Sequence, residues 1–130
     1  MKIRPITGYN CYRAYQVYRD ILLASYIFWN ANKVYLSDKE AKPESYKDFL
    51  MRFEKSTDEE KKDIIKLGAD TFNLSLEEVC FLVGLVEDAN GVPYSKANIN
   101  NLQPQEIINI IIAVCLEISK VTVFFYRPNK

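Results

Sequence analysis

Apolar side chains recur along most of this chain at the three- and four-residue spacing that is typical of amphipathic α-helices. The first such stretch runs from about residue 10 to about residue 33 and carries two apolar ridges. One ridge consists of Ala14, Val17, Ile21, Ala24, Phe28 and Tyr35, and the other of Tyr15, Leu22 and Trp29, flanked by Tyr18 and Tyr26. A helix with two apolar ridges has more than one partner surface. The pattern predicts this long first helix but leaves open which ridge is core and which is interface.

Three capping boxes indicate further helix starts. In each, a Ser or Thr hydroxyl can accept from a backbone N–H of the first turn, while a glutamate three residues later reaches back. The pairs are Ser37/Glu40, Thr57/Glu60 and Ser75/Glu78. Pro43 delays the expected start of the first of these helices to about Glu44, and we expect its end near Lys55. The third helix is expected to continue through Val86 and to stop within residues 88–93, where Gly91 suits a left-handed cap.

A loop and one more helix complete the predicted order. Residues 88–101 have loop composition, with room for a short extended stretch around residues 92–94. The last helix is expected to begin at Pro104 and to continue to about Phe125, a length that favours a helix over a buried strand. Residues 107–116 are apolar almost all round, which predicts burial on most sides and a surface that could continue into a subunit interface.

These elements together predict an all-α fold. We expect a small helical bundle of about five to six helices, forming a single domain over residues 1–130, with residues 126–130 as a frayed tail.

The composition removes several classes of catalytic site. The chain has no histidine, which excludes Ser-His and Cys-His catalysis and His-ligated zinc. Its three cysteines, Cys11, Cys80 and Cys115, form no CxxC pair and are expected to act as small core side chains in a reduced, intracellular protein. The four glycines are scattered singly, so no phosphate-binding loop is expected. We therefore expect no catalytic residues, metal or cofactor, and a protein that is not an enzyme.

The apolar stretches also indicate where the protein acts. The first residues lack the apolar core of a signal peptide. The longest apolar stretch, residues 107–118, is shorter than the roughly 20 residues that span a bilayer. We expect a soluble, cytoplasmic protein without a membrane partner.

The first helix carries more aromatic surface than one buried stripe requires, and it is basic. Residues 1–36 hold five basic side chains and one acid, a net charge of +4, although the whole chain has 17 of each and is neutral. The helix could be packed by neighbours on both sides, could bind a protein, or could stack on single-stranded nucleic acid. Neutral total charge makes nucleic acid the unlikely partner. The candidate protein-binding residues are Tyr12, Tyr15, Arg19, Leu22, Tyr26 and Trp29.

The order of these features resembles that of small tail assembly chaperones of long-tailed bacteriophages, especially those of Gram-positive hosts. The resemblance rests on residues 1–6 leading directly into an amphipathic helix, on residues 74–79, and on residues 101–108 before an apolar helix that ends in Phe124 and Phe125. The chain departs from that family at Gln103, where a Ser or Thr cap is expected, and in the aromatic content of residues 30–56.

The resemblance implies an all-helical protein that binds the tape measure protein while the phage tail is built. It implies apolar grooves for a long helical client and self-association into a homo-oligomer. It also implies action in the host cytoplasm and absence from the mature virion. The alternative from the residues alone is a small helical nucleic-acid-binding regulator that uses the basic aromatic first helix, where Arg13 and Arg19 would matter most.

Overall fold

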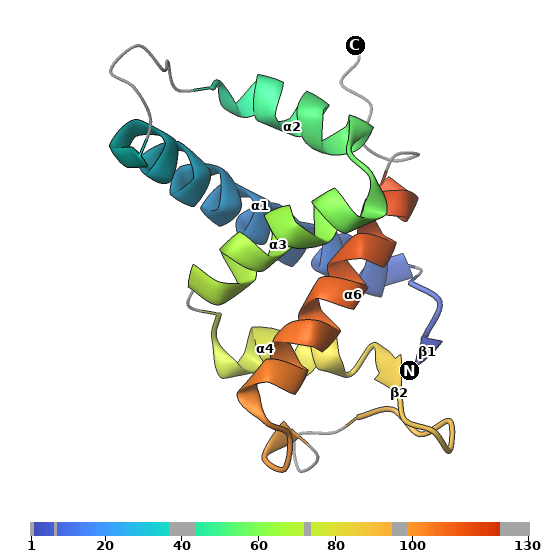
Figure 1. Ribbon diagram of the computed structural model, residues 1–130. Coiled ribbons are helices and arrows are strands. Elements are labelled where there is room, and N and C mark those ends of the chain that lie inside the picture. The colour runs from blue at the N-terminus through green and yellow to red at the C-terminus, as the bar shows by residue number, and fades with distance from the viewer. Residues whose placement is uncertain (1, 7, 37–43, 72–73, 95–98, 123–130) are drawn as a thin grey trace. The chain divides into compact units, whose positions relative to one another are not determined.

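The computed structural model describes residues 2–6, 8–36, 44–71, 74–94 and 99–122, and within them the chain is mostly helical (Figure 1). The helices are α1 (Gly8–Leu36), α2 (Tyr46–Lys55), α3 (Asp58–Thr71), α4 (Leu76–Val83) and α6 (Pro104–Thr122). Two short strands, β1 (Lys2–Ile3) and β2 (Val86–Glu87), pair as a small antiparallel sheet. The predicted all-α class is confirmed.

The chain divides into two compact units. Unit 1 comprises Met1–Tyr18 and Leu74–Lys130, and unit 2 comprises Arg19–Asn73, so α1 contributes to both. That residues 1–130 form a single domain stays a prediction. The expected frayed tail, residues 126–130, lies outside the described residues.

Unit 2 is built from the second part of α1 together with α2 and α3. Its buried side chains come from all three helices: Ile21 and Leu22 of α1, Phe49 and Phe53 of α2, and Ile64 and Ile65 of α3. Gly68 of α3 lies directly against α1, because a Cβ at this position would overlap the carbonyl oxygen of Ile21 and the Oγ of Ser25. The Ser25 hydroxyl is fully buried and donates to that same Ile21 carbonyl at 3.0 Å. The two helices therefore cross at a point where only glycine fits.

Unit 1 combines the start of α1 with α4, α6 and the small sheet. Helix α4 packs against α6, and the fully buried side chains between and around them include Leu82, Val83, Val114 and Cys115. Burial raises the pKa of the Cys115 thiol to about 12, so this cysteine is a core side chain as predicted. Cys11 and Cys80 are half-buried.

Helix α4 ends earlier than its sequence pattern predicts. It stops at Val83, with Gly84 as its C-cap, instead of continuing through Val86. The reason is tertiary, because Val86 pairs with Ile3 in the sheet and the Leu85 carbonyl accepts from the Arg4 N–H at 2.7 Å. An apolar run cannot reveal that its last residues will join a strand contributed by the distant N-terminus.

Gly91 has the expected positive φ, 78°, but it lies in a turn and not at a helix end. The turn returns the chain along β2, where Glu87 forms a bridge with Pro93 and the Tyr94 N–H donates to the Val86 carbonyl at 3.1 Å. The sequence left open a short extended stretch around residues 92–94, and the structure has a single β-bridge there, at Pro93.

Two of the three predicted capping boxes are confirmed. The Thr57 N–H donates to the Glu60 carboxylate at 2.8 Å, and Ser75 and Glu78 form both bonds of the box. The Ser37/Glu40 pair lies outside the described residues. Helix α2 begins at Tyr46, close to the start expected at about Glu44, and ends at Lys55 as expected, and the hydroxyl of its N-cap Ser45 accepts from the Asp48 N–H.

Helix α6 begins at Pro104 as predicted, although Gln103 is not a Ser or Thr. The Glu106 carboxylate accepts from the Gln103 N–H at 3.2 Å, which preserves one half of a capping box. Among the described helices, none is long and apolar enough to cross a membrane.

Candidate protein-binding face

The six predicted protein-binding residues differ widely in exposure along α1. Leu22 is buried, whereas Tyr15, Tyr26 and Trp29 are half-buried and Tyr12 and Arg19 are exposed. The structure therefore does not bring them together as one open surface. Of the other ridge, Ala14, Val17 and Ile21 are buried and Ala24 and Phe28 are half-buried, while the side chain of Tyr35 lies outside the described part.

In unit 2, the aromatic ridge of α1 holds the start of α2. The Tyr26 hydroxyl and the Asn30 Nδ2 both donate to the Glu44 carbonyl, at 2.8 and 3.0 Å. The Tyr26 ring also lies 5.2 Å from the ring of Tyr46 and 5.4 Å from that of Phe49, measured between centroids. These contacts place Tyr26 within the packing of unit 2.

Arg52 of α2 completes this packing. Its Nε and Nη2 each donate to a Glu44 carboxylate oxygen at 3.1 Å, a bidentate arrangement. The guanidinium carbon also lies 4.8 Å from the centroid of the Trp29 ring, a cation–π distance. The Trp29 Nε1 is buried without a hydrogen-bond partner among the described residues. Trp29 therefore serves this contact between α1 and α2, and its ring is not an open anchor.

In unit 1, Arg13 is engaged with α4. Its guanidinium lies 3.4 Å from the Glu77 carboxylate and 4.5 Å from the centre of the Phe81 ring. The charge of Arg13 is thus compensated within the unit. Because phosphate binding requires available positive charge, this pairing gives the nucleic-acid alternative no specific support.

An open apolar surface of unit 2 lies on a third side of α1. Leu23 and Ile27 are one helical turn apart, with exposed fractions of 43% and 60%. Arg19 and Asp20 precede them by one turn, and exposed Ala31 follows by one turn. We call Leu23 and Ile27 the aliphatic face. It belongs to neither ridge identified from the sequence.

The apolar periodicity of the sequence does not identify the aliphatic face as the side of α1 that stays exposed. Residues 21–23 and 26–29 are continuous apolar runs, so α1 presents apolar side chains in almost every direction. Such a pattern indicates that some apolar side chains of α1 must remain exposed to solvent. Which of them are exposed depends on where α2 and α3 pack. Gly68 is the one local signal, because a glycine inside a helix often marks a close approach of another backbone.

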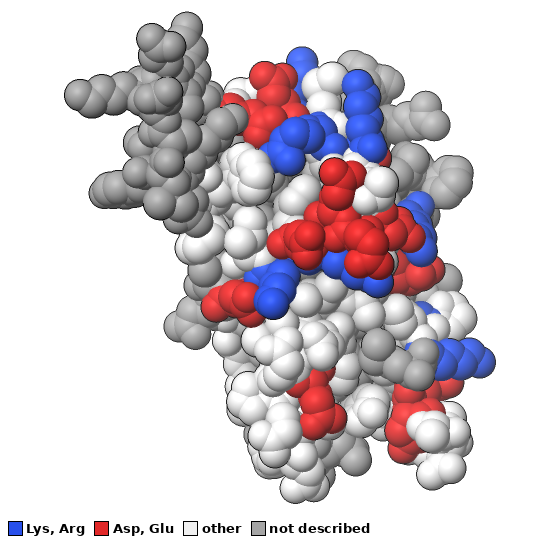
Figure 2. Space-filling model, in the orientation of Figure 1, with Lys and Arg blue, Asp and Glu red and all other residues white. Residues whose placement is uncertain are grey.

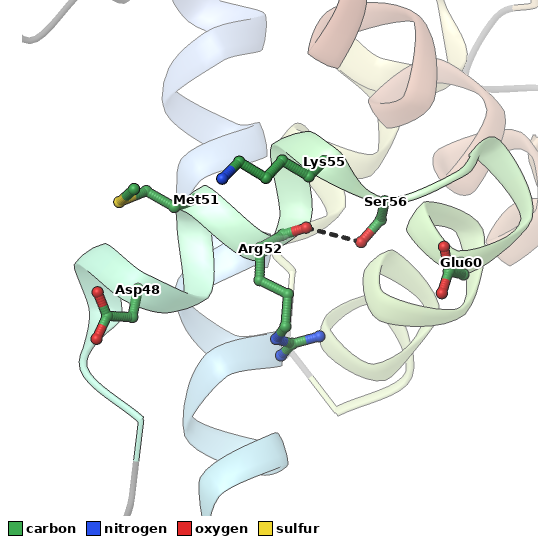
Figure 3. A pocket seen from close by; sticks show the side chains of 6 residues that line it. All are labelled: Asp48, Met51, Arg52, Lys55, Ser56 and Glu60. Carbon is green, nitrogen blue, oxygen red and sulfur yellow. Dashed lines mark hydrogen bonds between the residues drawn. The ribbon is translucent and has the colours of Figure 1, made fainter.

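A hollow beside α2 in unit 2 has a volume of about 480 Å³ and a mixed lining (Figure 3). Its side chains are Asp48, Met51, Arg52, Lys55, Ser56 and Glu60. The Ser56 hydroxyl donates to the Arg52 carbonyl, and the Arg52 guanidinium is held by Glu44. Hydrogen bonds with Thr57 lower the pKa of Glu60, and the bond to the Thr57 backbone has a larger effect than the bond to its hydroxyl. These groups stabilise helix ends and pairs, and we assign no ligand to the hollow.

More charged side chains lie on the surface of α2 and α3 than on the surface of α4 and α6 (Figure 2). Figure 2 shows blue and red side chains together over α2 and α3, whereas the surface over α4 and α6 is mostly white. Helix α6 carries no charged residue between Glu106 and Glu117, and Ile107, Ile108 and Ile112 on it are half-buried. Unit 1 therefore has an uncharged apolar surface of its own.

Among the described residues, no group of three or more His, Cys, Asp or Glu side chains could hold a metal ion.

Comparison with protein-family models, with curated proteins and with solved structures finds no match for this chain. The case for a function therefore rests on its residues and their surroundings.

Proposed function

We propose that this protein is a phage tail assembly chaperone that binds the tape measure protein through apolar surface and self-associates while the tail is built. The observation that supports it most is the aliphatic face, where Leu23 and Ile27 stay exposed on the part of α1 that belongs to unit 2. Adjacent exposed aliphatic side chains at helical spacing suit the apolar stripe of another helix. The resemblance of the sequence to tail assembly chaperones names the client.

One aliphatic face gives weak binding. Full burial of a Leu or Ile side chain stabilises a complex by roughly 1.5–3 kcal/mol, and both residues are already partly covered by their own helix. Ordering two proteins costs more than this pair returns. A chaperone with such a face therefore needs many linked copies along a long client, where avidity multiplies weak contacts.

Self-association is the second part of the proposal. The half-buried isoleucines of α6 lie on a helix segment without charge, which is the composition of a subunit interface core. The isoleucines of α6 and the aliphatic face are different residues, so self-association through the first does not use the residues assigned to the client. We place this activity in the host cytoplasm, before the tail is complete, with no catalytic step and no cofactor.

Co-expression with the tape measure protein of the same genome tests the proposal. We expect the tape measure protein to become more soluble and to co-purify with this chain. The double variant Leu23→Glu/Ile27→Glu should lose most of the co-purified client. Met51→Glu is the matched control, because Met51 is an equally exposed apolar residue of unit 2, at 47%, that lies on α2. Failure of the wild-type chain to co-purify with the client or to improve its solubility would remove the proposal.

A further inference from the structure

The turn after β2 contains the one asparagine of the chain that is followed by glycine, Asn90 before Gly91. Both residues are exposed. A Cβ built on Gly91 would meet no atom within 4 Å, so open space surrounds this position. Within the described residues, the Asn90 carboxamide takes part in no hydrogen bond. The side-chain amide carbon and the next backbone nitrogen are therefore neighbours without steric protection.

Asp88 restrains this turn. One oxygen of its carboxylate accepts from the backbone N–H of Asn90 at 2.8 Å and from that of Val92 at 3.0 Å. Its carbonyl accepts from the N–H of Gly91 at 3.0 Å. The Gly91 nitrogen must leave this last bond before it can react, so reaction at this site requires the turn to open.

We propose that Asn90 is a site of spontaneous deamidation, in which the backbone nitrogen of Gly91 attacks Cγ of Asn90. The N–Cγ bond forms and the Cγ–Nδ2 bond breaks. The Gly91 nitrogen loses its proton and the side-chain nitrogen leaves as ammonia, which gives a succinimide. Water then adds to one of the ring carbonyls and breaks its bond to nitrogen, leaving aspartate or isoaspartate. No oxidation, cofactor or second protein takes part.

The product changes the turn. The imide nitrogen carries no hydrogen, so the Gly91-to-Asp88 hydrogen bond is lost at the first step. Hydrolysis then places a carboxylate next to those of Asp88 and Glu87, where like charges repel. Isoaspartate also lengthens the backbone, which is incompatible with the present register of Asp88 and Val92 across the turn. Deamidation therefore loosens the bridge between Glu87 and Pro93.

The test follows each asparagine of the full-length folded chain during incubation at mildly alkaline pH. Proteolytic peptides are analysed by mass spectrometry, and isoaspartate is separated from aspartate by chromatography. We expect Asn90 to convert first, more slowly than in the denatured chain because the turn must open. Asn109, which is also exposed but lies in α6 and is followed by Ile110, is the internal control.

Two variants make the test specific to the turn. Asp88→Ala removes the acceptor of two backbone N–H groups, and we expect Asn90 to convert about tenfold faster. Asn90→Gln should leave this peptide unchanged, because its longer side chain closes a less favourable ring. The proposal is overturned if Asn90 of the folded chain stays intact while the denatured chain converts completely. It is equally overturned if Asn109 converts as fast as Asn90.

Discussion

At the scale of single residues, Gly68 is a position where side-chain size is strictly limited. Its missing Cβ allows α3 to touch the Ile21 carbonyl and the buried Ser25 hydroxyl. A backbone atom cannot move aside as a flexible side chain can. The crossing of α1 and α3 therefore depends on this glycine.

We expect Gly68→Ala to lower the free energy of unfolding by about 1–3 kcal/mol, the usual cost of overpacking. Alanine is the better helix former, so propensity alone predicts the opposite sign. Urea denaturation measures the difference, with Lys66→Ala, an exposed position of α3, as control. An unchanged or raised midpoint for Gly68→Ala would mean that the helices do not approach as closely as described.

The capping glutamate of α3 gives a prediction on pH. Hydrogen bonds from Thr57, mainly from its backbone N–H and to a lesser extent from its hydroxyl, favour the charged form of Glu60. The pKa of Glu60 is therefore lower in the folded than in the unfolded chain. Its stabilising contribution is complete above the unfolded pKa and is lost as pH falls through the folded pKa. Glu60→Gln should therefore be less stable than wild type at neutral pH, and the two should converge in acid.

Denaturation curves at several pH values check this convergence. Glu59→Gln is the matched control, because Glu59 is an exposed neighbour whose carboxylate contacts Lys62 and not Thr57. A gap between Glu60→Gln and wild type that persists unchanged in acid would contradict the assignment.

At the scale of elements, the sequence is most informative where a structure is local. Thr57 and Ser75 cap their helices as predicted, because each needs only a glutamate three residues away. Tertiary pairing was not predictable. Val86 continues an apolar helical run, yet it joins Ile3 in a sheet. Leu22 belongs to a ridge predicted from the sequence and Leu23 to neither, yet both lie in one apolar run, and the docking of α2 and α3 decides which is exposed.

The docking of α2 on α1 gives a prediction at this scale. Arg52 pairs with Glu44 through two nitrogens and covers the Trp29 ring. Lysine carries the same charge but lacks the planar guanidinium group with its several N–H donors. Arg52→Lys should therefore lose much of the contact with Glu44 and Trp29. We expect a loss of about 1 kcal/mol in unfolding free energy and a shifted fluorescence of Trp29, the sole tryptophan.

Lys55→Arg on the same helix is the control, because Lys55 is exposed and the substitution also exchanges one basic side chain for the other. Equal emission spectra for Arg52→Lys and wild type would show that Arg52 does not define the surroundings of Trp29.

At the scale of the whole molecule, the proposal requires self-association. The uncharged stretch of α6 between Glu106 and Glu117 is the surface to which we assign it. Light scattering at increasing concentration should give a mass above that of one chain, 15.1 kDa. Ile112→Glu should shift the mass toward the monomer, whereas Met51→Glu should not. A monomeric mass at every concentration would remove self-association from the account.

The central claim is that the aliphatic face of α1 binds an apolar helix of the tape measure protein. Its most direct test is the affinity of the purified, self-associated chain for a fluorescently labelled helical segment of that protein long enough to contact several copies, measured by anisotropy. The account predicts saturable binding that Leu23→Glu/Ile27→Glu weakens about thirtyfold or more, while Met51→Glu binds as wild type does. Equal affinity of the double variant and the wild-type chain would contradict it.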